Sequence, residues 1–248
     1  MLTGIALLIG SVWGMWRLHK FKFDLRSLLL GIYGIVGFHL FYFLGLRNAP
    51  VFEANLINYL WPLLIVVLAP LITKQKQNLK SFLFITCGFI GLLIALEVFT
   101  KSQLQIERGH LYSLLGAIVW STYSLLLPKS KHSAWDNSIT CFLSGVICLS
   151  IVAINHSWSL PTIDQWPWLI YVGLCPLGLS FYLWEFGARK VSASHLGNLS
   201  YLTPLFSMFF LSLAAKSTPS LSFWIGFGIV VLSSFLSTRW KRLRFKKG

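Results

Sequence analysis

Long apolar runs, separated by short polar segments, follow one another along the whole chain. A helix needs about 20 residues to cross the hydrocarbon core of a bilayer, and most of the runs approach that length. The pattern predicts nine candidate spans. They cover residues 2–16, 27–46, 53–73, 81–99, 110–128, 138–155, 166–187, 195–215 and 221–238. We therefore expect an all-α integral membrane protein, built as a polytopic helical bundle.

The span at 53–73 contains the most distinctive stretch of the chain, Asn58-Tyr59-Leu60-Trp61-Pro62. Because proline has no N–H, Pro62 leaves the carbonyl of Asn58 without its usual donor and weakens the helix locally. Inside a membrane such a freed group is tolerated only where neighbouring helices or a wet cavity satisfy it. We expect Pro62 to be a flexible point in the bundle interior.

The second half of the chain repeats this stretch. When the two halves are aligned without gaps so that Tyr201 falls on Tyr59, Pro204 falls on Pro62, Arg189 on Arg47 and Gly173 on Gly31. Matching proline, arginine and glycine residues are informative because each has a specific backbone or boundary role. The matches indicate an internal repeat, in which Pro204 is the second flexible point.

The repeat divides the chain into residues 1–100, residues 109–240 and a basic tail at 241–248. The span at 110–128 has no partner in the first half, because that partner would precede Met1. A full unit would hold five helices, an odd number, so the two halves would face opposite ways, which is a common plan for transporters. We therefore expect an inverted repeat of five helices that lacks its first helix. A misplaced start, a degraded gene and a true nine-helix variant all remain open as causes.

Composition excludes a soluble domain. Hydrophobic residues make up 56% of the 248 positions and charged residues 11%, and the mean hydropathy is +0.70. A soluble domain of this size has too little interior to bury so much apolar surface, so the chain belongs in a membrane.

The net charge of +14 changes the picture only through its placement. Most basic residues lie in alternate polar segments, namely Arg17, Lys20, Lys22, Arg26, Lys74, Lys76, Lys80, Lys129, Lys131, Arg189, Lys190 and the six in the tail from Arg239 onward. The intervening segments hold only Arg47, Lys101, Arg108 and Lys216. Basic loops face the cytoplasm, so we expect a cytoplasmic C-terminus, with the tail near anionic lipids. The charge is explained by topology, and we predict no nucleic-acid partner.

Few residues suggest covalent or metal chemistry. The cysteines Cys87, Cys141, Cys148 and Cys175 all fall inside apolar runs, without a CxxC pair or companion histidines. We interpret them as small core residues and predict no cofactor, metal or disulfide. A membrane enzyme would need convergent His, Asp, Cys or Ser groups near one interface, and the spans show none.

Glycines recur at helical spacing in two places. Gly31, Gly34 and Gly37 do so in one span, and Gly226 and Gly228 do so more loosely in the last. We expect all of them to mark close helix packing.

These motifs resemble the drug/metabolite transporter superfamily, EamA family, whose members have ten helices in two inverted repeats. Within it, the similarity is closest to bacterial aromatic amino acid exporters. It is carried by Asn58-Tyr59-Leu60-Trp61-Pro62, Tyr201-Leu202-Thr203-Pro204, His39 with Tyr42, and Trp120-Ser121-Thr122-Tyr123. It covers nearly the whole chain except the absent first helix. The resemblance implies two EamA-type halves and a multi-pass carrier in the bacterial inner membrane.

In such a carrier, aromatic side chains would line a central cavity and polar groups would meet the substrate's ends. Trp61 and Tyr59 point about 200° apart on a regular helix, so a kink would have to swing one toward the cavity. Packing between helices is the plain alternative for Trp61, and for the face shared by Trp120 and Tyr123. The predicted substrate-binding residues are His39, Tyr42, Asn58, Tyr59, Trp61, Trp120, Tyr123 and Tyr201. The predicted hinges are Pro62 and Pro204.

Proton coupling would need a titratable group inside a span. His39 is one candidate, although a structural hydrogen bond would explain it equally well. Glu185 is the other, but it lies four residues before Arg189, and an ordinary i, i+4 ion pair explains it. Glu53 and Glu97 lie near outer span ends and are weaker candidates.

The leading hypothesis is a carrier that exports small amphipathic metabolites, most of all aromatic amino acids, by alternating access. Its partners would be the small-molecule substrate and membrane lipids, with no obligate protein partner evident. The alternatives are export of other metabolites or of lipophilic cations, which aromatic rings also attract, and a truncated membrane protein that does not transport.

Overall fold

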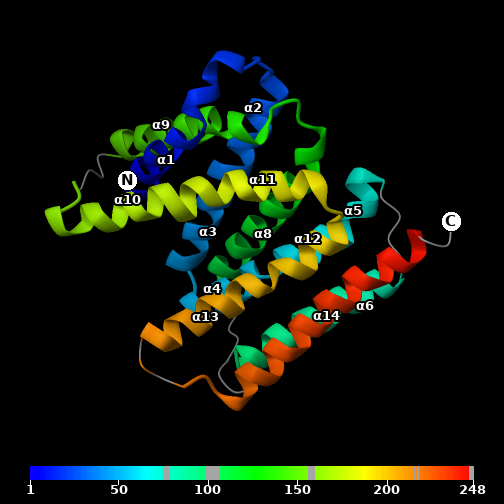
Figure 1. Ribbon diagram of the computed structural model, residues 1–248. Helices are drawn as coiled ribbons and strands as arrows, with labels where there is room; N and C mark the ends of the chain where they lie inside the picture. The colour runs from blue at the N-terminus through cyan, green and yellow to red at the C-terminus, as the bar shows by residue number, and fades with distance from the viewer. Residues whose placement is uncertain (75–78, 99–106, 156–159, 215, 217, 246–248) are drawn as a thin grey trace. The chain divides into compact units, whose positions relative to one another are not determined.

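The computed structural model of the chain is built of helices (Figure 1). It describes residues 1–74, 79–98, 107–155, 160–214, 216 and 218–245, with the side chains of residues 211 and 238–245 left out. Every regular element in those ranges is an α-helix, a 3₁₀-helix or a π-helix. The predicted all-α class is therefore confirmed for the described residues.

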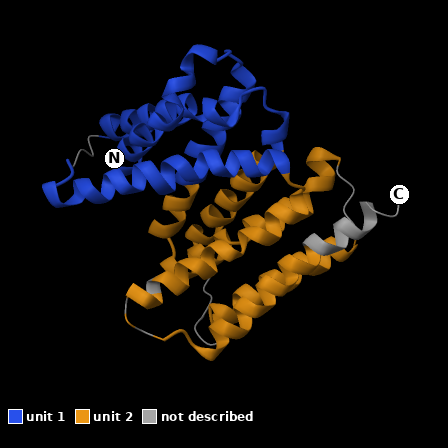
Figure 2. Cartoon of the chain, in the orientation of Figure 1, with its two compact units in different colours: residues 1–40, 126–190 blue, residues 41–125, 191–248 orange. Residues whose placement is uncertain are grey.

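The helices cluster into two compact units, shown in different colours in Figure 2. One comprises Met1–Leu40 and Leu126–Lys190, and the other Phe41–Leu125 and Val191–Gly248. Each unit therefore takes helices from both halves of the sequence. The predicted halves, 1–100 and 109–240, are consecutive stretches of sequence, whereas the two units are defined by contacts in space. The halves therefore stay a prediction.

The first unit is organised around the N-terminal helix. Its elements are α1 (Leu2–Gly10), the 3₁₀-helix η1 (Ser11–Lys20), α2 (Leu25–Ile32), the π-helix η2 (Tyr33–Gly37), the start of α3 (Phe38–Arg47), the short 3₁₀-helices η3 (Leu127–Lys129), η4 (Ala134–Asp136) and η5 (Ile163–Gln165), α9 (Asn137–Ile154), α10 (Trp166–Leu174), the π-helix η6 (Cys175–Leu179) and α11 (Ser180–Lys190). Helix α1 packs on α9 and α10. Small residues make this possible, because a Cβ on Gly4 would lie 3.1 Å from the backbone oxygen of Gly145.

The start of α2 has a well-formed cap. Asp24 accepts hydrogen bonds from the backbone N–H and the hydroxyl of Ser27, at 3.0 and 2.7 Å, and pairs with Lys131 at 3.3 Å. These bonds, those from Ser27 first, stabilise the ionised carboxylate and lower the pKa of Asp24 to about 2. The cap therefore stays ionised at physiological pH.

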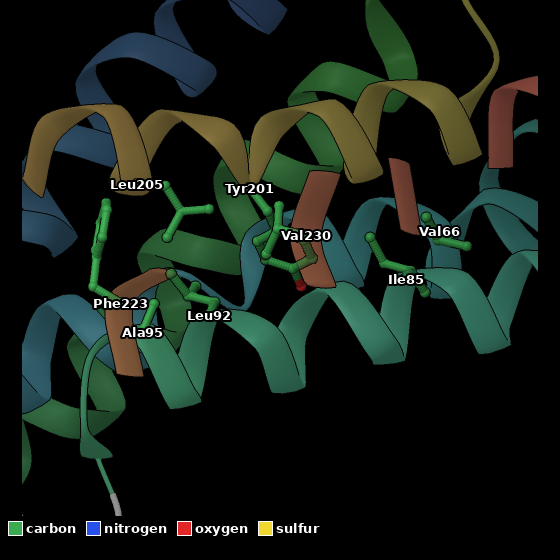
Figure 3. Packing of buried hydrophobic residues seen from close by; sticks show 8 residues of the cluster. All are labelled: Val66, Ile85, Leu92, Ala95, Tyr201, Leu205, Phe223 and Val230. Atoms are coloured by element: carbon green, nitrogen blue, oxygen red, sulfur yellow. The ribbon is translucent and has the colours of Figure 1, made fainter. Parts of the chain in front are cut away.

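The second unit contains a cluster of buried hydrophobic side chains. Its elements are the end of α3, α4 (Val51–Asn58), α5 (Trp61–Thr73), α6 (Leu79–Ala95), α8 (Arg108–Leu126) up to Leu125, α12 (Ala193–Ser200), α13 (Leu202–Ala214) and α14 (Leu221–Phe245). Helices α6 and α14 lie side by side, and α12 packs on α5 (Figure 1). Figure 3 shows the buried side chains that meet among them, Val66, Ile85, Leu92, Ala95, Tyr201, Leu205, Phe223 and Val230.

Among the described residues, six helical segments are long and apolar enough to cross a membrane, namely Leu25–Arg47, Val51–Thr73, Arg108–Lys129, Ala134–Ile154, Ile163–Lys190 and Ala193–Ala214. The apolar helices Leu79–Ala95 and Leu221–Ser237 are shorter. The α-helical part of the predicted span 2–16 ends at Gly10, and the chain continues as a 3₁₀-helix. The sequence did not predict this change, because an apolar pattern does not distinguish an α-helix from a 3₁₀-helix. The count of nine spans stays a prediction. Residue 99, residue 215, Lys76, Lys101, Lys246 and Lys247 lie outside the described residues.

The spans that contain Pro62 and Pro204 are each interrupted shortly before that proline. Helix α4 ends at Asn58, a turn follows at Tyr59 and Leu60, and α5 begins at Trp61 with Pro62 as its second residue. Proline is well suited to a first helical turn, where its missing N–H would have no intrahelical partner. In the second half α12 ends at Ser200, and Pro204 falls in the first turn of α13. The predicted local weakening at Pro62 is therefore seen as a break between two helices.

Several element bounds recur in the ungapped alignment of the two halves. With Tyr201 aligned to Tyr59, the bounds of the π-helix Cys175–Leu179 fall on those of Tyr33–Gly37. In the same alignment α12, at Ala193–Ser200, begins and ends where α4 does, at Val51–Asn58. The sequence analysis did not anticipate the π-helices, because one extra residue per turn leaves no mark on an apolar run.

The glycine interpretation is confirmed at Gly31 and Gly226 and is wrong at Gly228. A Cβ on Gly31 would lie 2.5 Å from a side-chain carbon of Thr140, and one on Gly226 would lie 2.3 Å from the backbone oxygen of Gly91. A Cβ on Gly228 would meet nothing within 4 Å. Two residues on a helix turn by about 200°, so Gly226 faces α6 and Gly228 points away.

Replacing these two glycines by alanine should therefore have opposite effects. Gly226→Ala forces α14 away from backbone atoms of α6 and should lower the free energy of unfolding by about 1–3 kcal/mol. Gly228→Ala should be neutral or stabilising by about 0.5–1 kcal/mol, since alanine favours the helix. Thermal unfolding of the purified variants in detergent measures both, and equal effects would contradict the α6–α14 contact described above.

Candidate functional site

Three helices of the second unit converge at Gly116 on α8. A Cβ there would lie 3.5 Å from the backbone nitrogen of Tyr42 on α3 and 3.6 Å from Oδ1 of Asn58 on α4. Ser113 lies one turn before Gly116 on α8. A Cβ on Gly45, which faces it from α3, would lie 2.3 Å from Oγ of Ser113. We call this place, formed by Tyr42, Gly45, Asn58, Ser113 and Gly116, the Gly116 junction. It contains two of the predicted substrate-binding residues.

The hydroxyl of Tyr42 is held in place by a residue that the sequence analysis missed. It donates a 2.8 Å hydrogen bond to Oδ1 of Asn55, whose Nδ2 in turn donates to the carbonyl of Val51 at 2.9 Å. Asn55 lies one turn before Asn58 on α4, so a recurring asparagine on one helix face was the available signal.

Two buried polar atoms at the Gly116 junction have no hydrogen-bond partner among the described residues. They are Oδ1 of Asn58, on a residue with 5% of its surface exposed, and Oγ of Ser113, on a residue that is fully buried. An enclosed polar group without a partner costs about 1–3 kcal/mol of stability. Such groups are therefore strong candidates for contact with a ligand. Asn58 was predicted from the sequence, and Ser113 was not.

Helix α8 also holds the start of α5. The hydroxyl of Ser121 lies 2.9 Å from the backbone carbonyl of Trp61 and 2.6 Å from that of Ala117, four residues earlier on α8. This contact places the half-buried Trp61 next to α8, directly after the break between α4 and α5. Ser121 belongs to the Trp-Ser-Thr-Tyr motif, but its role at this break was not predicted.

The shared face expected for Trp120 and Tyr123 is confirmed. Their rings are 5.4 Å apart with an interplanar angle of 51°, and both side chains are buried. Rings at this spacing attract each other beyond their burial. The pair gives α8 a rigid aromatic surface, and its role in substrate binding stays a prediction.

Two predicted tyrosines pack with the hydrophobic cluster of the second unit. Tyr201 is fully buried in the cluster shown in Figure 3, where its ring is 6.1 Å from that of Phe89. Tyr59 packs against the same cluster. Burial among apolar side chains accounts for the position of both rings, and their role as substrate residues stays a prediction.

His39 belongs to the first unit. It is buried, as expected for an ionisable side chain in a membrane span, and its ring lies 6.0 Å from that of Phe181 on α11. Its Nδ1 is 2.7 Å from the carbonyl of Ile35, inside the π-helix of its own span. Because a carbonyl only accepts, Nδ1 carries the proton and donates it there.

The i, i+4 ion pair predicted for Glu185 is confirmed. Its Oε2 lies 3.2 Å from Nη2 of Arg189, and Nη1 of Arg189 donates to the carbonyl of Ser130 at 3.2 Å. The buried carboxylate therefore has a matching cation on its own helix. This pairing accounts for the conformation of Glu185, and its role in coupling stays a prediction.

A second buried acid, which the sequence analysis ranked low, has a partner 57 residues away. Oε2 of Glu53 on α4 lies 2.9 Å from Nε2 of His110 on α8, and each residue has 8% of its surface exposed. Nδ1 of the same ring accepts the backbone N–H of Glu107 at 2.9 Å. Neither helical periodicity nor a motif relates residues so far apart, so only the histidine near the start of a span could have drawn attention to it.

Comparison with known proteins adds the family. Residues 1–96 and 107–239 match the EamA-like transporter family. The chain is 28% identical over 215 residues to the aromatic amino acid exporter YddG of Ancylobacter novellus, and this alignment covers 84% of the present chain and 74% of that protein. It is 27% identical over 245 residues to the aromatic amino acid exporter YddG of Salmonella typhimurium, which covers 87% and 78%. A solved structure, described as the crystal structure of a protein, matches with a TM-score of 0.87 at 26% identity and covers 96% of this chain and 87% of that one.

The family match spans both large portions of the sequence, on either side of residues 97–106. The six long apolar helices independently indicate several membrane crossings. The chain therefore belongs to the EamA-like transporter family, as a multi-pass membrane transporter.

Proposed function

We propose that the protein is a carrier of the bacterial inner membrane that exports small amphipathic metabolites, with aromatic amino acids as its substrates, by alternating access. The observation that carries this proposal is the pair of partnerless polar atoms at the Gly116 junction, Oδ1 of Asn58 and Oγ of Ser113, among the described residues. Similarity to two proteins named aromatic amino acid exporters supports the same substrate class.

The two atoms offer complementary chemistry to a zwitterion. The amide oxygen of Asn58 only accepts hydrogen bonds, which suits an α-ammonium group, and the hydroxyl of Ser113 can donate to an α-carboxylate. Both occupy neutral side chains, so the site binds a molecule with no net charge without leaving a buried ion when it departs.

Aromatic side chains of the second unit supply the apolar part of the site. Trp61 follows Asn58 across the helix break, and Trp120 lies one turn beyond Gly116 on α8, in contact with Tyr123. Indole and phenol rings stack on aromatic substrates in offset or edge-to-face geometry. Lipophilic cations would be attracted to the same rings, which makes them the natural competitors in any transport assay.

The helix breaks supply the hinges of the proposed cycle. Tyr59 and Leu60 separate α4 from α5 directly before Pro62, and Tyr201 separates α12 from α13 before Pro204. A break that ends in proline cannot close into a continuous helix, so the two parts can change their angle at little cost. Movement at these breaks would reposition Trp61 relative to Asn58.

We also propose that the chain is an inverted repeat with a cytoplasmic C-terminus. The recurrence of α4 and of the π-helix at one common offset supports a repeat, and the basic segments support the orientation. In this arrangement the α3–α4 turn at Asn48 faces outward, and the equivalent turn after α11 at Lys190 faces the cytoplasm.

Cysteine labelling tests this orientation. Asn48→Cys and Lys190→Cys introduce thiols at exposed positions of the two equivalent turns. A membrane-impermeant maleimide applied to intact cells should label the first variant above the background of the parent chain and leave the second at background until the membrane is opened. Labelling of both from the same side would contradict the inverted repeat.

Replacing Trp61 tests the substrate site. In proteoliposomes, Trp61→Ala should raise the KM for tryptophan and phenylalanine by about three- to tenfold, the value of one aromatic contact, while alanine flux stays low. Trp168→Ala is the matched control, because that side chain is 72% exposed on α10.

A fall in folded yield for Trp61→Ala, with KM unchanged, would show that Trp61 only packs between helices. Absence of saturable aromatic flux from a well-folded parent chain would contradict the proposed function itself. Saturable flux of a lipophilic cation in the same vesicles, without aromatic amino acid flux, would redirect it to the alternative substrate class.

Replacing Asn58 by leucine separates function from stability. Leucine keeps the shape but removes the partnerless amide oxygen, so the thermal unfolding temperature should rise or stay the same. The kcat/KM for an aromatic amino acid should fall about tenfold, equivalent to one hydrogen bond of about 1.5 kcal/mol to a charged group. Lower stability together with unchanged kcat/KM would mean that the amide is structural.

A further inference from the structure

The buried pair of Glu53 and His110 lies where two helices of the second unit begin. Glu53 is the third residue of α4, and His110 is the third residue of α8. The N-terminal ends of helices carry partial positive charge, which favours a carboxylate and disfavours an imidazolium. Both helix ends therefore favour an ionised Glu53 beside a neutral His110.

The hydrogen bonds determine which ring nitrogen of His110 carries the proton. The backbone N–H of Glu107 can only donate, so Nδ1, at 2.9 Å, accepts with its lone pair. The proton of the neutral ring is then on Nε2, which donates to the carboxylate of Glu53 at 2.9 Å. In this state the enclosed pair carries a net charge of −1.

No cation among the described residues compensates this charge. The other charged or titratable groups on α3, on α4, at the start of α8 and at the residue before it are His39, Tyr42, Arg47, Glu107, Arg108 and Tyr112. Arg47, Glu107 and Arg108 are exposed, and Tyr42 donates its hydroxyl to Asn55. In the described part of the chain, Glu53 forms an ion pair only with His110. A buried net charge without a counterion is costly, so the pair favours the uptake of a cation.

The chemistry of the pair suits a proton and not a metal ion. The two oxygens of one carboxylate and one ring do not form a metal site, and no group of three or more His, Cys, Asp or Glu side chains gathers there in the described ranges. We therefore propose that Glu53 and His110 form a proton-binding site, in which one proton from water adds to Nδ1 of His110 and turns the pair from a net charge of −1 to neutral. An imidazole ring is a stronger base than a carboxylate, so the ring takes the proton.

Proton binding changes a contact between two parts of the chain. A proton on Nδ1 faces the N–H of Glu107, and two donors repel each other, so the Glu107 hydrogen bond is lost. The next residues are tightly joined to the α3–α4 turn, because the N–H of Gly109 donates to the carbonyl of Asn48 at 3.0 Å. A Cβ on Gly109 would lie 2.5 Å from that same oxygen. Uptake of one proton therefore loosens the joint between the start of α8 and the α3–α4 turn.

This site suits coupling better than the two sequence-based candidates do. Glu185 already has Arg189 as a counterion, and His39 donates from Nδ1 to a carbonyl of its own helix. Glu53 and His110 instead join α4 to α8, the two helices that hold Asn58 and Gly116. Protonation of this pair therefore controls movement of α4 against α8 during the transport cycle, an inference that rests on the proposed transport function.

The first test needs no substrate. In lipid nanodiscs, ¹⁵N-histidine NMR of the wild type should show His110 as the Nε2–H tautomer at high pH and as imidazolium at low pH, with His110→Gln identifying its signals. Amide hydrogen exchange at Glu107 should gain an extra acceleration, beyond its ordinary pH dependence, over the same pH range. Glu53→Gln keeps an acceptor for Nε2 but provides no counterion, so both changes should disappear from that range.

Glu107→Gln is the matched control, because it removes an exposed carboxylate beside the pair and leaves the backbone N–H in place. It should titrate like the wild type. An Nδ1–H tautomer at high pH, or identical titrations of the wild type and Glu53→Gln, would overturn the proposal.

The second test measures coupling in proteoliposomes that carry an imposed pH difference. In the wild type, flux of an aromatic amino acid should change about tenfold per pH unit in the compartment whose protons limit the cycle, because flux then follows the proton concentration there. Glu53→Gln should lose this dependence, and Glu107→Gln should keep it. Loss of the dependence in Glu185→Gln, with Glu53→Gln unaffected, would assign coupling to the other acid. Absence of flux from every variant would contradict the proposed function, whereas the NMR titration would still decide the proton site.

Discussion

The structure depends on one constraint, that a backbone polar group inside hydrocarbon has to find its hydrogen-bond partner within the protein. A regular helix meets this constraint by itself, and each irregularity needs a side chain to meet it instead. In the π-helix Tyr33–Gly37, the carbonyl of Ile35 accepts a hydrogen bond from His39 as well as from the backbone N–H of Phe38. The break between α4 and α5 brings the carbonyl of Trp61 within reach of Ser121. Irregular backbone is therefore found where buried hydroxyl and imidazole groups are available.

The same constraint gives meaning to the groups that it leaves unsatisfied. Glycine contacts such as Gly91 with Gly226 let helix backbones approach closely. The oxygens of Asn58 and Ser113 at the Gly116 junction are two of several buried side-chain atoms without a hydrogen-bond partner among the described residues, and they lie close together on facing helices. A substrate that brings its own donor and acceptor would remove both penalties at once, which connects stability of the empty site to affinity for the filled one.

Sequence reasoning predicted the features that depend on local order along the chain. Apolar runs predicted helices, Pro62 predicted a local weakening of its helix, and spacing predicted the Glu185–Arg189 pair and the shared face of Trp120 and Tyr123. It could not predict which face of a helix meets a neighbour, so it treated Gly226 and Gly228 alike. For the same reason it grouped Tyr201 with the substrate residues, although that ring lies in the hydrophobic cluster. It ranked Glu53 by its distance from a span end, whereas the partner that matters is 57 residues away.

In the proposed function, the buried polar groups of the second unit would separate substrate binding from proton binding by charge. The Gly116 junction presents neutral amide and hydroxyl groups, which can bind and release a zwitterion without creating a buried ion. The ionisable pair lies at the helix starts instead, where helix ends stabilise the carboxylate and a proton can cancel its charge. If the charge sat at the junction, each departure of substrate would strand an ion in a low-dielectric interior. Placing it at the starts of the same helices, three residues before Ser113 and five before Asn58, would let a change in charge alter the positions of α4 and α8 without adding that cost to binding.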